Sequence, residues 1–319
     1  MRTLTLSLAL ACKTDDGATT NVPPGPTDSD TDPSTDTTTE TTTTSETGTS
    51  YTTLPVTADF TRPRVAVNDA TSCWLRPDDS TIECWGQSDV ANDAPRGAYL
   101  QIDLGGESAC VLDPYGVAVC WGDNTFGQLN VPDQSYFIDI TVADRHACGI
   151  ETDGGLLCWG STGYGMINAP DGAYVQVDAQ NLTTCAIRTD GLTFCWGNTF
   201  TGQAAVPPLV FTDVDLGEFH VCGKADDGAL DCWGIDNTFG QLDAPIDGGP
   251  YVDISAGHLH GCALSDAGVA TCWGDANLDR LEAPSTMGFI QIDAAAAHTC
   301  AITESAIDCW GDNTAGQLP

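Results

Sequence analysis

The tripeptide Cys-Trp-Gly occurs seven times within residues 60–319, and this repeat limits the possible folds more than any other feature of the chain. The triplets begin at Cys84, Cys120, Cys158, Cys195, Cys232, Cys272 and Cys309. Successive triplets are 36 to 40 residues apart. A fixed period of this size is typical of stacked supersecondary units that bury their faces only against one another.

The unit that ends at the third triplet shows what each repeat contains. Residues 136–140 and 146–150 are short runs rich in β-forming side chains, the turn sequence Thr152-Asp153-Gly154 follows, and residues 156–159 form a third run. Such runs, separated by Asp-Gly turns, predict antiparallel hairpins. No segment has a convincing helical period. We therefore expect an all-β region with three or four short strands per unit.

Each triplet cysteine has a second cysteine nine to eleven residues upstream. In a hairpin centred on Asp153, Cys148 and Cys158 lie directly opposite each other, close enough for a disulfide. Structural zinc is the alternative, but zinc sites use cysteines two to four residues apart, so disulfides are favoured. The predicted pairs are Cys73–Cys84, Cys110–Cys120, Cys148–Cys158, Cys185–Cys195, Cys222–Cys232, Cys262–Cys272 and Cys300–Cys309.

The tryptophan of each triplet indicates how the units pack. Strand alternation places Trp159 on the opposite face from Cys158, so both faces of each small sheet carry apolar groups. Radial repetition of such sheets is a β-propeller, and seven units fall within its usual range. A β-solenoid would need shorter periods and no Asp-Gly hairpins. We predict a seven-bladed propeller over residues 60–319, with inter-blade packing by Trp85, Trp121, Trp159, Trp196, Trp233, Trp273 and Trp310.

The N-terminus has the pattern of an export signal. Arg2 precedes a short apolar run over residues 4–11, which is too short to span a membrane. The run ends at Cys12 and resembles a bacterial lipoprotein signal, although Ala9 stands where that family prefers Leu. We expect residues 1–12 to be a signal whose Cys12 is lipidated; an ordinary signal peptide is the alternative. Cys12 is also the one cysteine left after the seven pairs.

Residues 13–59 are rich in Thr, Ser, Asp and Pro and have no apolar period. Such composition cannot bury enough surface to offset ordering entropy, so we expect a disordered linker. The alternating aspartates at positions 28, 30 and 32 match the start of a calcium loop. Pro33 and Thr39 stand where that loop needs Gly and Glu, and a solvated spacer is favoured.

The residues after each triplet carry a family resemblance. The run over 121–129 recurs at 233–242, with Ile235 inserted, and at 310–318, and the segment His298-Thr299-Cys300 precedes the last pair. These runs resemble the repeat of the regulator-of-chromosome-condensation family. The resemblance implies a seven-bladed propeller whose loops bind other proteins. The paired cysteines depart from the nuclear members and are typical of secreted bacterial members.

The net negative charge of the chain limits the classes of molecule that it can bind. The chain has 45 acidic and 10 basic residues, and residues 60–319 hold 36 of the acids and 8 of the bases, a net charge of −28. Nucleic-acid affinity depends on Lys and Arg, so nucleic acid is excluded as a partner and the chromatin role of nuclear members does not carry over. Docking on anionic lipid through a basic patch is equally disfavoured, which leaves a lipid anchor as the expected membrane contact.

No pattern in the chain predicts catalysis or a cofactor. Four histidines stand two residues before the first cysteine of a pair; packing is favoured over a metal site for them. They are His146, His220, His260 and His298. The Asp-Asn of the Gly-Asp-Asn-Thr run suits a turn. No nucleophile or phosphate-binding motif occurs.

We therefore expect a monomeric, non-enzymatic propeller on the bacterial surface or in the extracellular space. Its expected partner is a protein or a surface glycan. The alternatives are a structural or carbohydrate-binding component, and a hydrolase or lyase acting on the propeller face. The repeat boundaries leave open how the ring closes.

Overall fold

The computed structural model describes residues 64–198, 200–247 and 249–319. The expected signal over residues 1–12, the lipidation of Cys12 and the linker over residues 13–59 lie outside the described residues. Within the described part of the chain, no helix combines the length and apolarity needed to cross a membrane.

Twenty-one strands make up almost all of the regular structure. The first four blades consist of β1 (Val65–Val67), β2 (Thr71–Leu75), β3 (Ile82–Gly86); β4 (Gln101–Gly105), β5 (Ser108–Leu112), β6 (Ala118–Gly122); β7 (Phe137–Val142), β8 (His146–Glu151), β9 (Leu156–Gly160); and β10 (Tyr174–Gln180), β11 (Thr183–Arg188), β12 (Thr193–Gly197). The last three consist of β13 (Phe211–Leu216), β14 (His220–Ala225), β15 (Leu230–Gly234); β16 (Tyr251–Ala256), β17 (His260–Ser265), β18 (Ala270–Gly274); and β19 (Gln291–Ala294), β20 (His298–Ile302), β21 (Ile307–Gly311).

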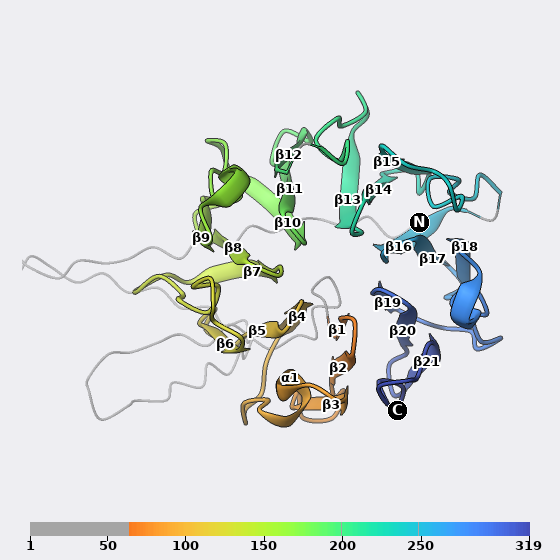
Figure 1. Cartoon of the computed structure of the whole chain (residues 1–319), viewed down its shortest axis with the longest axis horizontal. Helices are drawn as coiled ribbons and strands as arrows, with labels where there is room; N and C mark the ends of the chain where they lie inside the picture. The colour runs from red at the N-terminus through yellow and green to blue at the C-terminus, as the bar shows by residue number, and fades with distance from the viewer. Residues whose placement is uncertain (1–63, 199, 248) are drawn as a thin grey trace, which may run out of the picture. The chain divides into compact units, whose positions relative to one another are not determined.

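Each group of three consecutive strands forms one antiparallel sheet. The seven sheets are arranged in a ring, with the first strand of each nearest the centre and the third at the outside (Figure 1). The prediction of an all-β, seven-bladed propeller is confirmed. Each described sheet has three strands, the lower of the two numbers expected.

The hairpin between β8 and β9 has the predicted register. Cys148 lies directly opposite Cys158. The N–H of Glu151 donates to the carbonyl oxygen of Gly155 at 2.7 Å and closes a three-residue loop. Gly154 in this loop has φ +88°, a left-handed conformation that glycine adopts without steric cost.

The hydrophobic core is divided among the spaces between neighbouring blades. Between blades 2 and 3, Leu112 of β5 packs with Phe137 and Ile140 of β7 and with Trp159 of β9. The rings of Phe137 and Trp159 have centroids 5.6 Å apart. Because both faces of a sheet are buried in this way, the strands carry apolar side chains on both sides.

Within the residues that the structure describes, no strand is shared across the seam between blade 7 and blade 1. Two backbone amides of blade 1 donate to side chains of blade 7: Arg64 N to Gln291 Oε1 at 3.0 Å, and Val67 N to Asp293 Oδ2 at 2.6 Å. A small apolar cluster containing Trp74 and Ile302 fills the space between these blades. Closure is therefore noncovalent, which settles a point that the sequence left open.

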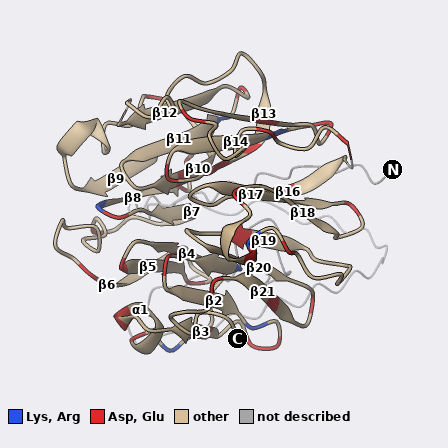
Figure 2. Cartoon of the chain, turned by 45° about the vertical axis from the view of Figure 1, so that its right-hand side comes forward, with Lys and Arg blue, Asp and Glu red and all other residues tan. Residues whose placement is uncertain are grey.

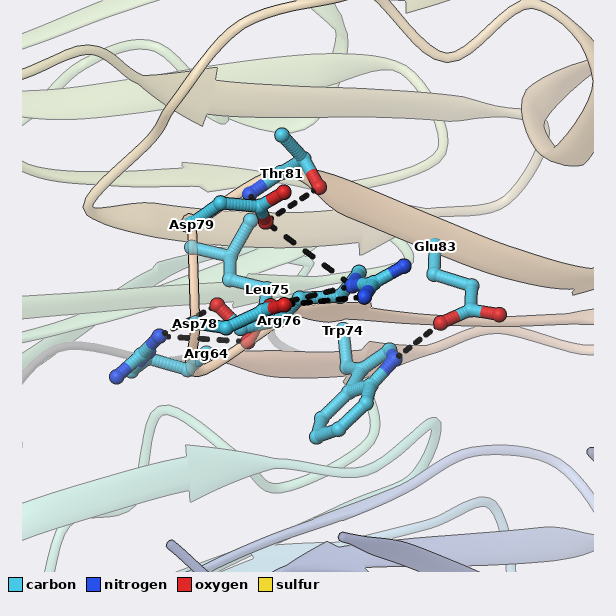
Figure 3. Close-up of polar contacts among 8 residues, drawn as sticks. All are labelled: Arg64, Trp74, Leu75, Arg76, Asp78, Asp79, Thr81 and Glu83. Atoms are coloured by element: carbon cyan, nitrogen blue, oxygen red, sulfur yellow. Dashed lines mark hydrogen bonds and ion pairs between the residues drawn. The ribbon is translucent and has the colours of Figure 1, made fainter. Parts of the chain in front are cut away.

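Arg64, at the start of the seam, also contacts the backbone of blade 1 through its side chain. The Arg64 guanidinium donates to the carbonyl oxygens of Leu75 and Arg76, while Arg76 pairs with Asp78 at 3.1 Å (Figure 3). The Trp74 indole N–H donates to the carboxylate of Glu83 at 3.3 Å.

Among the described residues, helical structure is confined to three short segments. They are α1 (Asp89–Asn92), η1 (Gly163–Gly165) and η2 (Asn277–Asp279). The Ser88 side chain accepts a hydrogen bond from Ala91 N and so caps α1. Each segment takes the place of the Gly-Asp-Asn-Thr turn found in other blades.

Candidate functional site

Seven disulfides hold the second and third strands of every blade together. The structure pairs all fourteen cysteines singled out from the sequence, with Cα–Cα distances of 4.0 to 4.1 Å. The pairs are Cys73–Cys84, Cys110–Cys120, Cys148–Cys158, Cys185–Cys195, Cys222–Cys232, Cys262–Cys272 and Cys300–Cys309. The first cysteine of each pair is fully buried, so these bonds belong to the framework.

The triplet tryptophans connect each blade to the one before it. Six of the seven donate an indole N–H to a backbone carbonyl oxygen of the preceding unit, at 2.8 to 3.0 Å. They are Trp121 to Val90, Trp159 to Gln128, Trp196 to Met166, Trp233 to Gln203, Trp273 to Gln241 and Trp310 to Arg280. The seventh, Trp85, packs in the cluster at the seam.

The four histidines are buried on the second strands and are spread over four blades. Burial lowers their pKa to about 4 for His146, His220 and His298 and to about 3 for His260, so they are neutral near pH 7. Within the described residues, no three His, Cys, Asp or Glu side chains are arranged to hold a metal ion. Three of them hydrogen-bond to a hydroxyl group of the next blade: His146, His260 and His298.

The first strands carry half-buried carboxylates that the sequence analysis did not identify. Six aspartates accept a hydrogen bond from a backbone amide of the next blade, at 2.6 to 3.0 Å. Two of them are Asp139, which accepts from Val177, and Asp253, which accepts from Ile292. The other four, on blades 2, 4, 5 and 7, stand at one position of the repeat. Their hydrogen bonds are Asp103 to Val142, Asp178 to Leu216, Asp215 to Ala256 and Asp293 to Val67. These carboxylates pair with backbone N–H groups at the edge of the neighbouring first strand, which has no strand partner on that side.

These carboxylates also influence one another's ionisation. Burial raises the pKa of Asp103 to about 6, and burial together with the charge of Asp103 raises the pKa of Asp178 to about 7. The pKa values of Asp215 and Asp293 are raised well above the ordinary range by burial and by neighbouring aspartates. All four stand on first strands, which lie nearest the centre of the ring (Figure 1), so they surround the propeller axis.

The sequence does contain a signal for these four aspartates. Asp103, Asp178, Asp215 and Asp293 each stand seven residues before the first cysteine of a pair, and Thr141 and Ser255 occupy the same position in two other units. A polar residue recurring at one position of an otherwise apolar strand could have marked an axial layer.

A cavity of about 760 Å³ opens where the axis meets one face of the propeller. We call the loops between the first and second strands of the blades the inner turns, and the segments after the third strands the outer loops. Inner-turn residues of blades 1 to 6 and outer-loop residues of blades 1 and 2 line this cavity. The face that bears these loops is called the inner-turn face below.

The cavity lining is strongly acidic. Asp69, Glu107, Asp144 and Glu218 come from four different blades, and His258 from a fifth. His258 lies between two of the carboxylates: its Nε2 is 3.2 Å from Asp69 Oδ1 and its Nδ1 is 3.2 Å from Glu218 Oε2. Lys and Arg are sparse over the whole ring, whereas Asp and Glu recur along it (Figure 2).

The ionisation of these groups follows from their crowding. Burial alone would lower the pKa of His258, but its hydrogen bond to Asp69 and the charges of Asp69 and Glu218 raise it. The same hydrogen bond lowers the pKa of Asp69. Burial raises the pKa values of Asp144 and Glu218, and the charge of Asp69 adds to both shifts.

The outer loops are built by local side-chain hydrogen bonds. Asp123 accepts from Thr125 N at 3.1 Å, and Asn124 accepts from Leu129 N at 3.0 Å. Gln128 is buried and donates to the carbonyl oxygen of Asp144 in the next inner turn at 3.3 Å. The Asp-Asn pair therefore has the turn role expected from the sequence, and the glutamine fixes the loop against the next blade.

The same loops expose apolar side chains at one recurring position in blades 2 to 6. These are Phe126, Tyr164, Phe200, Phe239 and Leu278, with exposed fractions from 39% to 78%. The inserted Ile235 is 73% exposed, and its N–H donates to the carbonyl oxygen of Thr201, next to Phe200. We call these six residues the apolar arc. In blade 1 the equivalent residue is the buried Val90, and in blade 7 it is Ala315.

The comparisons with known proteins agree with this architecture. Residues 211–241 match the sequence model of the regulator of chromosome condensation (RCC1) repeat. That segment holds the three strands and the outer loop of blade 5. No curated protein matches the chain.

Several solved structures share the fold. The CRINKLY WD40 ectodomain of the Arabidopsis thaliana receptor kinase ACR4 is similar at 22% identity and a TM-score of 0.67, over 81% of this chain and 98% of that chain. The ectodomain of the Physcomitrella patens receptor kinase CR4 is similar at 22% identity and a TM-score of 0.67, over 78% and 73%. Prp20p of Saccharomyces cerevisiae is similar at 16% identity and a TM-score of 0.62, over 82% and 85%.

At these identities the likeness establishes the fold and leaves partners to further argument. The described region is a seven-bladed propeller, its blade 5 matches the RCC1 repeat model, and its fold is similar to that of Prp20p.

Proposed function

We propose that this chain is an exported propeller that binds another protein through one of its faces. The observation that carries the proposal is the contrast between framework and loops. The disulfides, the triplet indoles and the four second-strand histidines are buried or half-buried, whereas the outer loops expose side chains such as Phe200 and Ile235. Large apolar side chains gathered on one exposed surface are typical of interaction sites.

Similar propellers that bind proteins support this role. The structure of Prp20p is described together with its binding to Gsp1p and histones, and Prp20 is also described bound to Kap60. The two plant propellers are parts of receptor-kinase ectodomains. Their partners are their own, and what carries over is the use of this fold as a binding platform.

Export is supported by the disulfides. Seven disulfides are typical of proteins in oxidising compartments. We propose that residues 1–12 direct export, that Cys12 is lipidated, and that residues 13–59 hold a monomeric propeller away from the bacterial surface. Mass spectrometry of the N-terminal peptide from the native cell tests the lipid: the peptide should begin at a diacylated Cys12.

A pull-down tests protein binding. The purified full chain serves as bait, and the same chain after reduction and alkylation serves as the control for a lost fold. A protein that is captured by the native bait alone, and that binds again when purified, supports the proposal. A glycan array is probed in parallel. Selective glycan binding with no protein captured would replace the proposal with a carbohydrate-binding role.

A further inference from the structure

We propose that the inner-turn face binds a basic, apolar segment of a partner protein, with apolar side chains on the apolar arc and a Lys or Arg in the axial cavity. This inference rests on the proposed protein-binding function and adds the chemistry of the partner and the face that holds it.

The apolar arc and the cavity belong to one continuous surface. Asp123 and Asn124 line the cavity, and Phe126 follows them on the same outer loop. The outer loop of blade 4 is likewise fixed at this face, because Gln203 donates to the carbonyl oxygen of Gly217 in the inner turn of blade 5 at 2.9 Å. A ligand that covers Phe126 therefore also meets the rim of the cavity at blade 2.

The arc is exposed in a way that a stable isolated surface rarely is. Phe200 and Ile235 are more than 70% exposed, and the backbone hydrogen bond between Ile235 and Thr201 joins the outer loops of blades 4 and 5. Removing such side chains from water stabilises a complex. Exposed aromatic residues of this kind are the residues that most often dominate protein interfaces.

Charge complementarity selects the partner. Seven carboxylates line the cavity, four of them from inner turns, and His258 already lies between two of those four. A Lys or Arg side chain placed there would meet several acidic groups inside a concave site, where charges interact more strongly than on an open surface. One aromatic ring of the arc already contacts a cation: the Arg145 guanidinium lies 4.7 Å from the Phe126 ring centroid.

The other occupants are less compatible with this surface. Residues 13–59 hold nine acidic residues and one basic residue, so this chain's own N-terminal segment has the same sign of charge as the cavity. A second copy of the same face is equally acidic. A small polycation would fit the cavity but would leave the arc uncovered.

Fluorescence anisotropy with three short peptides tests the inference on the full chain. The probe peptide contains equal numbers of Lys and Leu in a Gly/Ser background. One matched peptide replaces each Lys with Glu, and the other replaces each Leu with Ser. The probe should bind at least about ten-fold more tightly than either matched peptide at about 0.1 M salt, because it alone satisfies both features.

Paired variants locate the binding. F200S/I235S and D69N/D144N/E218Q should each weaken binding of the probe by about ten-fold or more. Two controls make matched changes in the turns between the second and third strands: V117S/V269S for exposed apolar residues, and D153N/D226N/D266N for charge. Both controls should bind the probe as the unchanged chain does, and circular dichroism should show that all four variants are folded.

Two results of the peptide experiment overturn the inference. One is equal weakening by the charge control, which would mean attraction by net charge alone. The other is the absence of preference for the probe. If a protein identified by the pull-down still binds both face variants fully, the inference fails while the proposed function stands. If the native bait captures no protein, the proposed function itself fails.

Discussion

The imidazole of His146 in blade 3 meets the hydroxyl of Thr184 in blade 4, with Nε2 and Oγ1 2.6 Å apart in a fully buried position. The same pairing joins His260 to Thr299 at 2.9 Å and His298 to Ser72 at 2.8 Å. The second residue of each pair stands directly before the first cysteine of its blade.

His220 lacks the hydrogen bond to the next blade that the other three histidines make. The equivalent position in the next blade is Gly261, which has no hydroxyl, and both ring nitrogens of the buried His220 lack a hydrogen-bond partner. A side chain at Gly261 would collide with the ring of Trp273, because an added Cβ would lie 2.5 Å from Trp273 Cζ2.

This contrast predicts opposite effects of one substitution. His146→Leu should lower the free energy of unfolding by about 1 to 3 kcal/mol, because it leaves the buried Thr184 hydroxyl unpaired. His220→Leu should be neutral or stabilising, because it removes a buried polar ring without a partner. Urea unfolding of both variants checks this, and equal destabilisation would contradict it.

Removal of one disulfide should lower the stability of the protein without unfolding it. Replacing Cys148 and Cys158 together by Ala should lower the free energy of unfolding by about 2 to 3 kcal/mol while the fold is kept, because the ring closed by this bond is short. Denaturing unfolding curves measure the effect. Alkylation of the denatured, unreduced chain supplies the control: it should label none of the fourteen paired cysteines, and labelling of all fourteen would contradict the structure.

The axial carboxylates predict that stability falls as pH rises above neutrality. A carboxyl whose pKa is higher in the folded chain than in the unfolded chain stabilises the fold at low pH, and that contribution is lost as pH rises through the folded pKa. The pKa of Asp178 and of Asp253 is raised to about 7. The buried histidines act in the opposite direction, but only below the ordinary histidine pKa of about 6.5. The free energy of unfolding should therefore decrease between about pH 6.5 and pH 8.5.

Asp178→Asn isolates this effect. The amide oxygen can still accept the hydrogen bond from Leu216 N, and the amide carries no charge at any pH. At pH 8 this variant should be more stable than the unchanged chain by about 1 kcal/mol or more, with a shallower dependence on pH. Asp266→Asn, on an exposed hairpin turn, should change neither quantity. A loss of stability in Asp178→Asn at pH 8 would contradict the assignment.

Glycines in the inner turns set how closely blades approach. A Cβ added to Gly217 would lie 2.2 Å from the carbonyl oxygen of Gly257 in the next blade. Gly217→Ala should therefore cost about 1 to 3 kcal/mol of stability, as overpacking does. Gly163→Ala is the control, because its Cβ would meet no atom closer than 3.5 Å. Thermal unfolding compares the two, and a similar melting temperature for both would contradict the prediction.

Much of the framework could be read from the sequence because it repeats. A spacing of nine to eleven residues between cysteines forces a short hairpin, and alternation then fixes the face of Trp159. The turn role of Asp123 and the packing role of His146 followed in the same way. Each of these inferences needed only contacts within a blade or between adjacent blades.

The candidate site could not be predicted, because it is made by the ring as a whole. Asp69, Glu218 and His258 are far apart in sequence and meet only because blades 1, 5 and 6 face one axis. The exposure of Phe200 could not be predicted either, because an aromatic residue in a repeat can equally belong to the core. Closure of blade 7 on blade 1 depends on Asp293 and Gln291, whose partners lie at the other end of the folded region.

The most direct test of the account is photo-crosslinking from the inner-turn face. A photoreactive benzoylphenylalanine replaces Phe200 in the full chain in its native cell, and in a second strain it replaces Val117 on a turn between second and third strands. The account predicts a crosslink from position 200 to a protein whose joined peptide contains Lys or Arg beside apolar residues, and no such crosslink from position 117. A protein crosslinked from position 117 and not from position 200 would contradict it.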